Sequence, residues 1–128
     1  MRRRSHHPLA VLALASALLL TGCGGTVSST NGDDVESVVG RWSSDEKGEP
    51  HLEFFEDGSV KGSDGCNGIN TTYEQTDATI TIEPAVSTLK GCPGVDTWLR
   101  KCRTLEINGS EMTVKNANDE EIGTLTRD

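Results

Sequence analysis

From residue 38 to the C-terminus, most apolar residues alternate with polar ones, which is the pattern of half-buried β-strands. Leu52 and Phe54 fall on one side of such a strand. Asp57-Gly58 then supplies the residue types of a tight hairpin turn, and Val60 begins the return strand. The pattern therefore predicts a β-hairpin early in the folded part of the chain.

The alternation continues in the middle and at the end of the chain. Residues 80–82 read as a strand, Pro84 interrupts the alternation, and residues 86–89 resume it. Three further apolar segments, joined by Asn-Gly and by a second polar turn, predict an antiparallel meander over 105–107, 112–114 and 122–125.

One segment changes to the period of a helix. Its apolar residues are spaced at i, i+3, i+4 and i+7, and they are Val95, Trp98, Leu99 and Cys102. Pro93 suits a first helical turn, and the basic residues late in the segment complement the helix dipole. We expect one short helix to lie across the sheet, held by tertiary packing, and to contribute Trp98 to the core.

The first 22 residues have the organisation of an export signal. Three arginines precede the twelve-residue apolar run 9–20, which is too short to cross a bilayer. The sequence Leu20-Thr21-Gly22-Cys23 resembles the bacterial lipobox. This resemblance implies transfer of a diacylglyceryl group to the Cys23 sulfur and cleavage before Cys23. An ordinary signal peptide, with Cys23 in a disulfide, is the alternative.

Lipid modification of Cys23 would anchor the protein to the membrane. Two buried acyl chains give a stable anchor, at about 0.8 kcal/mol per CH₂ group. Residues 23–37, rich in Gly, Ser and Thr, then form the lipidated Cys and a flexible tether, and residues 38–128 form the domain. We expect a protein of the cell membrane, lipid-anchored on its extracytoplasmic face and held near the surface without lying on it.

Charge and composition limit the partners. The chain has 12 basic and 20 acidic residues, and all 20 acids but only nine of the bases follow residue 22. Because nucleic-acid-binding proteins present a basic surface, no nucleic-acid partner is expected. The expected partners are the membrane, through the lipid anchor, and an unidentified protein or small molecule. The low apolar content also predicts a small core that a covalent cross-link would stabilise.

Three cysteines remain once Cys23 is lipidated, and outside the cytoplasm two of them are expected to pair. Cys66 and Cys92 lie at glycine-flanked ends of strand segments, where backbones can approach closely, so we favour this pairing. Cys102, on the apolar face of the predicted helix, is then a buried thiol. Pairing of Cys102 with either of the other two stays open.

Catalytic and metal-binding motifs are absent from the sequence. His51 is the only histidine after residue 22, and it begins a predicted strand beside Pro50. We therefore expect no catalytic residues, no cofactor and no metal, since the chain also lacks a C-x-x-C pair. Calcium binding at 116–121 is an alternative, although the ligand spacing of a calcium loop is not met.

The segment Gly62–Asn70 is the best candidate for a specific local role. Its Gly, Asp and Asn residues suit an irregular turn with closely packed backbone. Asp64 and Asn67 are the candidate binding residues. In the alternative interpretation the segment is structural, and Asn67 hydrogen-bonds backbone groups.

From residue 39 to the C-terminus the chain resembles the META domain family, whose bacterial members include the heat-shock-associated protein HslJ. The most specific matches are D-G-C-N at 64–67 and T-L-K-G-C-P at 88–93, in this order and spacing. Gly40-Arg41-Trp42, Leu52-Glu53-Phe54 and Tyr73 also match. The resemblance implies a mainly β (α+β) fold, a small and partly open antiparallel β-barrel crossed by one short helix.

Members of this family have no established catalytic residues, and some are linked to stress response, antibiotic tolerance or motility. The resemblance thus favours a lipid-anchored, non-enzymatic domain that acts in the cell envelope through interaction or stress tolerance. The alternative is a small-ligand carrier that uses the open end of the barrel and would contain an apolar cavity. An enzyme that uses surface carboxylates is the least favoured hypothesis.

Overall fold

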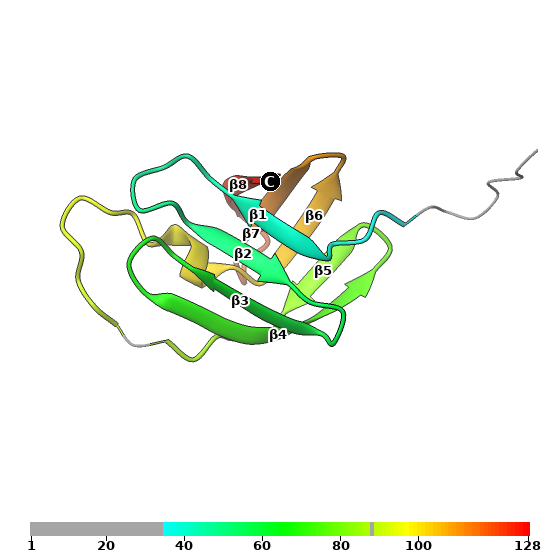
Figure 1. Ribbon diagram of the computed structural model, residues 1–128, viewed down its shortest axis with the longest axis horizontal. Coiled ribbons are helices and arrows are strands. Elements are labelled where there is room, and N and C mark those ends of the chain that lie inside the picture. The colour runs from blue at the N-terminus through cyan, green and yellow to red at the C-terminus, as the bar shows by residue number, and fades with distance from the viewer. Residues whose placement is uncertain (1–34, 88) are drawn as a thin grey trace, which may run out of the picture.

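The computed structural model describes residues 35–87 and 89–128, and it shows eight antiparallel strands closed into one barrel (Figure 1). The strands are β1 (Gly40–Ser43), β2 (His51–Phe54), β3 (Ser59–Ser63), β4 (Gly68–Thr76), β5 (Thr79–Ile82), β6 (Thr104–Asn108), β7 (Glu111–Lys115) and β8 (Glu121–Arg127). Each strand pairs with the next in sequence, and β1 pairs with β8 to close the barrel. The topology is therefore up-and-down, without a crossover.

Period-two alternation directs one side of each strand into the barrel. In β2, Leu52 and Phe54 are both 1% exposed, and in β5, Ile80 and Ile82 are buried in the same way. The buried apolar residues form one cluster that fills the interior: Val38, Trp42, Leu52, Phe54, Val60, Ile69, Ile80, Ile82, Trp98, Leu99, Cys102, Leu105, Ile107, Met112, Val114 and Leu125. Barrels of eight strands are just wide enough for side chains to fill them.

The predicted hairpin and the C-terminal meander are confirmed. Strands β2 and β3 pair through a turn in which Gly58 adopts a φ of +84°, a conformation that a residue with a Cβ rarely adopts. Strands β6, β7 and β8 pair in sequence, and Gly109 has a φ of +64° in the turn between β6 and β7. The turn residues read from the sequence therefore lie where the chain reverses.

Two features of the predicted fold class are wrong, because the barrel is closed rather than partly open and no α-helix crosses it. In place of the helix the described residues contain the 3₁₀ turn η1 (Trp98–Lys101). Gly94 has a φ of +73°, Thr97 has φ −94° and ψ 36°, and Cys102 is already extended, with φ −55° and ψ 136°. Helical structure is therefore limited to the four residues between Thr97 and Cys102. The predicted apolar face is nevertheless confirmed at three of its positions, because Trp98, Leu99 and Cys102 are buried.

Two further differences concern strands. The strand expected at 86–89 is absent from the described part of that segment, where Val86 and Leu89 are exposed. Strand β4, the longest of the eight, was not predicted from the sequence. Three of its inward positions are occupied by polar or aromatic side chains, each of which donates a hydrogen bond to a backbone carbonyl group. Thr71 donates to Glu83 O, Tyr73 to Phe55 O and Gln75 to Glu36 O. These positions give no apolar alternation.

The predicted signal peptide, the predicted lipidation site Cys23 and most of the predicted tether lie outside the described residues. Among the residues that are described, no helix is long and apolar enough to cross a membrane. Residues 36 and 37 contact the barrel, where Gln75 Nε2 donates to Glu36 O and Arg127 Nη2 donates to Ser37 O. The chain is therefore held by the barrel before β1 begins.

Candidate functional site

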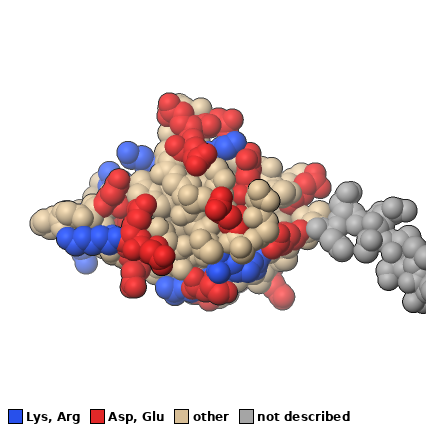
Figure 2. Space-filling model, turned by 90° about the horizontal axis from the view of Figure 1, so that it is seen from above, with Lys and Arg blue, Asp and Glu red and all other residues tan. Residues whose placement is uncertain are grey.

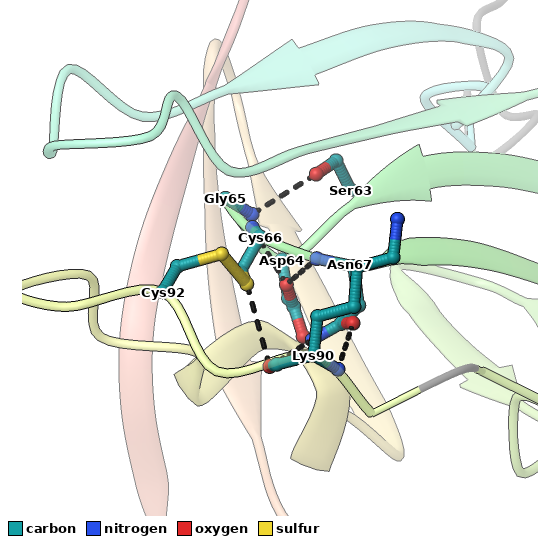
Figure 3. The surroundings of a disulfide bond; sticks show 7 residues. All are labelled: Ser63, Asp64, Gly65, Cys66, Asn67, Lys90 and Cys92. Atoms are coloured by element: carbon teal, nitrogen blue, oxygen red, sulfur yellow. Dashed lines mark hydrogen bonds between the residues drawn. A yellow bond between two sulfur atoms is a disulfide. The ribbon is translucent and has the colours of Figure 1, made fainter.

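The turn between β3 and β4 is built around the Asp64 carboxylate (Figure 3). Its Oδ1 accepts hydrogen bonds from the backbone N–H groups of Cys66 at 2.9 Å and Asn67 at 2.6 Å. The Asp64 N–H in turn donates to Asn67 O at 2.9 Å. Gly65, with a φ of +92°, allows the sharp reversal. Asp64 Oδ2 is buried and has no hydrogen-bond partner among the described residues.

Asn67 joins this turn to the long connection between β5 and η1. Its Oδ1 accepts from the Lys90 N–H at 2.7 Å, and its Nδ2 donates to Lys90 O at 3.2 Å. The Asn67 side chain thus bonds both backbone polar groups of Lys90, as the backbone of a neighbouring strand would. The disulfide Cys66–Cys92, the pairing favoured from the sequence, lies beside this contact and is confirmed, while Cys102 is a free buried thiol. A covalent bond and two hydrogen bonds therefore hold the connection against the barrel.

The two candidate binding residues are almost inaccessible. Asp64 is 0% exposed and Asn67 is 2% exposed. All four hydrogen-bonding partners described above are backbone groups of the same protein, as the structural interpretation of Gly62–Asn70 expects. Their observed contacts are therefore those of residues that position the β5–η1 connection.

A groove of about 520 Å³ lies beside that connection. Its lining comes from the connection itself, from η1 and the residue before β6, and from the β7–β8 turn: Ala85, Ser87, Leu89, Arg100, Lys101, Arg103, Asn116, Ala117 and Asn118. Alanine and leucine side chains provide an apolar wall, and three cationic side chains provide a basic one. The groove therefore combines the two features that an anionic amphiphile would contact.

The β5–η1 connection, which lines one side of the groove, carries the most exposed large apolar side chains of the described chain. Val86 is 90% exposed and Leu89 is 76% exposed, whereas Val35, the third, is 43% exposed. The apolar alternation predicted a strand for Val86 and Leu89, and the nearby basic residues were interpreted as partners of a helix dipole. The groove was missed because no local pattern shows that segments 85–89, 100–103 and 116–118 meet.

One end of the barrel is covered by Trp98. A Cβ on Gly123 of β8 would lie 2.6 Å from the Trp98 ring, so the indole lies directly on the bare backbone. Its Nε1 donates to Glu46 Oε2 at 2.6 Å, which satisfies the one polar atom of the ring. Together with the packed core, this side chain occupies the space that a carrier would reserve for a ligand.

Titratable groups of residues 35–87 and 89–128 are engaged in turns and at strand ends. The His51 ring Nδ1 lies 2.9 Å from Glu49 O, at the strand start expected from the sequence. Hydrogen bonds from Ser59 lower the pKa of Asp57, so this carboxylate is a turn acceptor. No group of three or more His, Cys, Asp or Glu in the described ranges is placed to hold a metal ion.

Comparison with known proteins gives one family. The sequence profile of the META domain matches residues 26–128. No curated protein and no solved structure matches the chain. The matched region contains the whole barrel, the disulfide and the groove.

Proposed function

The chain belongs to the META domain family, and we propose that it is a lipid-anchored, non-enzymatic member that acts on the extracytoplasmic face of the cell membrane through its exterior surface. The likeness to HslJ and a role in envelope interaction or stress tolerance are parts of the same proposal. The observation that carries it is a packed barrel interior combined with a disulfide at the base of an exposed loop.

The location is supported by two independent features of the chain. The three arginines, the apolar run and the Leu20-Thr21-Gly22-Cys23 sequence together fit a lipoprotein signal. The Cys66–Cys92 disulfide is a bond that persists in oxidising compartments and is rare in the cytosol. An exported chain acylated at Cys23 would satisfy both.

The mode of action is supported by the distribution of polar groups. The buried polar side chains of the described residues bond the protein's own backbone, as Asp64 and Asn67 do. Exposed groups, by contrast, border an open groove outside the barrel. The small-ligand carrier, which would use the barrel interior, gains no support from a closed and filled barrel.

The test is the attachment of the protein to bacterial membranes. One chain keeps the natural leader, and the other carries Cys23→Ser behind an ordinary cleavable signal peptide, so that an uncleaved leader cannot itself hold the membrane. After a high-salt wash, which removes electrostatically bound proteins, the natural chain should stay in the membrane fraction and the Cys23→Ser chain should be released.

Cys102→Ala is the matched control, because it removes the other unpaired cysteine and leaves Cys23 in place. It should stay with the membranes as the natural chain does. Retention of the Cys23→Ser chain after the wash would contradict the lipid anchor.

A further inference from the structure

We propose that the β5–η1 connection and the adjoining basic residues form a docking surface for an anionic lipid bilayer, made of Val86, Leu89, Lys90, Arg100 and Lys101. This inference rests on the proposed membrane location and adds how the barrel meets the membrane. It replaces the expectation, drawn from the acidic residues at the end of the predicted tether, that the domain does not lie on the surface.

The apolar part of the docking surface is two side chains on one loop. At 90% and 76% exposure, Val86 and Leu89 are nearly as accessible as in an unfolded chain. Figure 1 places the connection that carries them at one end of the long axis, outside the barrel. Apolar side chains that project from a loop can enter the boundary between headgroups and acyl chains, where removal of their surface from water is favourable.

The cationic part follows from where the few basic residues lie. Residues 84–103 contain four bases and one acid, a net charge of +3, although the remaining described residues contain five bases and 17 acids. In the described part of the chain neither Arg100 nor Lys101 joins a salt bridge, while Arg41, Lys115 and Arg127 do. Unpaired cations are available to lipid phosphates.

The space-filling view shows the surroundings of these cations. In Figure 2 several Lys and Arg side chains lie around the left end of the molecule, next to uncharged surface and with Asp and Glu side chains among them. Asp and Glu side chains also cover much of the rest of that face. Because residues 84–103 carry a net charge of +3 and the other described residues a net charge of −12, an anionic bilayer would attract this segment and repel the body, which orients the domain.

Contacts at the base of the β5–η1 connection keep its apolar side chains exposed. Cys92 is bonded to Cys66, and both backbone polar groups of Lys90 are bonded to Asn67 (Figure 3). These contacts hold the base of the connection one residue away from Leu89, so the loop cannot fold its leucine back into the filled barrel. Pre-ordered loops lose less conformational entropy on binding than free ones.

The described chain begins at the end of the barrel opposite the docking surface. The chain enters at the right of Figure 1, and the β5–η1 connection is at the left. Twelve residues, 24–35, lead from Cys23 to the start of the described chain. Fully extended they reach about 40 Å, whereas the longest strand spans about 30 Å. The predicted tether is therefore long enough for Cys23 to enter the bilayer that the docking surface contacts while the Val35 end of the barrel stays off it.

The test uses the chain from residue 23 with Cys23→Ser, so that no acyl chain contributes. Sedimentation with vesicles that contain phosphatidylglycerol is compared with sedimentation with vesicles of phosphatidylcholine alone. We expect binding to the anionic vesicles, loss of this binding as salt is raised, and little binding to the neutral ones. Arg100→Gln with Lys101→Gln should weaken binding about 30-fold, and Val86→Ser with Leu89→Ser about tenfold.

Matched controls change the same residue types elsewhere on the barrel. Arg41→Gln with Lys61→Gln removes two exposed charges, and Val35→Ser removes the other exposed valine. Both should bind within about twofold of the parent chain, because exposed charges beyond a Debye length of about 10 Å contribute little.

Failure of the unacylated chain to bind anionic vesicles, or equal losses in the docking-surface variants and the controls, would overturn the docking surface. Absence of vesicle binding would also leave the cations free for an acidic protein, which is a different partner. Neither result touches the Cys23 anchor, since that test reads attachment of the acylated chain after a salt wash.

Discussion

Asn67 shows how a single side chain can replace a strand edge. Its amide carries one acceptor and two donors, and the two groups that face Lys90 match the backbone N–H and C=O of that residue. Because the site is buried, loss of the amide would leave polar backbone groups unbonded away from water. The side chain is therefore placed to stabilise the loop.

We predict that Asn67→Ala lowers the free energy of unfolding by about 2–3 kcal/mol, because both Lys90 hydrogen bonds are lost. Asn70→Ala, at an exposed position on β4, is the control and should change stability by no more than about 0.5 kcal/mol. Urea unfolding followed by tryptophan fluorescence measures both. If Asn67→Ala and Asn70→Ala lower the free energy of unfolding by equally small amounts, the contact with Lys90 does not hold the loop.

Cys102 gives a second prediction at this scale. Burial raises the pKa of its thiol from 9.0 to about 12. A raised pKa favours the protonated form in the folded state, so its stabilising effect is present below pH 9 and is lost as pH rises towards 12. The reactive species is the thiolate. In folded protein we expect almost no alkylation of Cys102 at pH 8, and faster labelling only as the pH approaches 12.

The measurement is mass spectrometry after iodoacetamide treatment without reductant. In urea at pH 8 the domain should gain one label, because the buried thiol becomes accessible and the disulfide cysteines stay blocked. Rapid labelling of folded protein at pH 8 would contradict a buried thiol.

At the scale of elements, the contact between η1 and β8 decides how the barrel end is closed. The Trp98 ring lies where a side chain on residue 123 would project, so only glycine leaves enough room. Well-packed interiors tolerate added methyl groups poorly, since the neighbours must move off their preferred rotamers. Thus η1 and β8 are matched in shape rather than joined by hydrogen bonds.

Gly123→Ala should therefore destabilise the domain by about 1–3 kcal/mol. Gly68→Ala is the control, because a Cβ there meets its nearest neighbour, Gly62 O, only at 4.0 Å. Trp98→Phe in the Gly123→Ala background should recover part of the loss, which a double-mutant cycle in urea reports. Similar costs for the two alanine variants would show that the ring is free to move.

The β5–η1 connection depends on the disulfide as well as on Asn67. Cys66 and Cys92 are 26 residues apart, and the chain-entropy model gives such a cross-link about 3 kcal/mol. Joint replacement, Cys66→Ser with Cys92→Ser, should lower the unfolding free energy by that amount. Cys102→Ala is the control, and its urea midpoint should still fall when reductant breaks the disulfide. An unchanged urea midpoint in the double variant would contradict the estimate.

The sequence was sufficient for elements whose signal is local. Alternating apolar residues located β2, β5 and the β6–β8 meander, and Gly-containing pairs located two turns. It was insufficient where tertiary contacts decide. Thr71 and Gln75 face inward on β4 because distant backbone groups accept or donate to them, and the helix signal at 95–102 reduced to η1 because Gly94 leaves the helical range.

The candidate site was predicted in part for the same reason. The Cys66–Cys92 bond and the buried role of Asn67 follow from glycine-flanked cysteines and turn residues. The groove does not, because Leu89, Arg100 and Ala117 come from three separate segments. Exposure of Val86 and Leu89 likewise depends on a barrel that is already full.

At the scale of the whole molecule, an acidic barrel carries a basic and apolar loop at one end, and the described chain begins at the other. In the proposed function the filled interior leaves the exterior to act, and the lipid on Cys23 would hold that exterior at the membrane. Charge asymmetry of this kind sets orientation and the rate of encounter more than affinity. Membrane attachment is therefore the property on which the rest of the account depends.

The mass of the intact protein, extracted from membranes with detergent, tests that property most directly. The account predicts a chain that begins at Cys23, carries the added mass of a diacylglyceryl group, with or without a further acyl chain, and contains one alkylatable thiol after unfolding. A chain of unmodified mass, or one that begins at a residue other than Cys23, would contradict it.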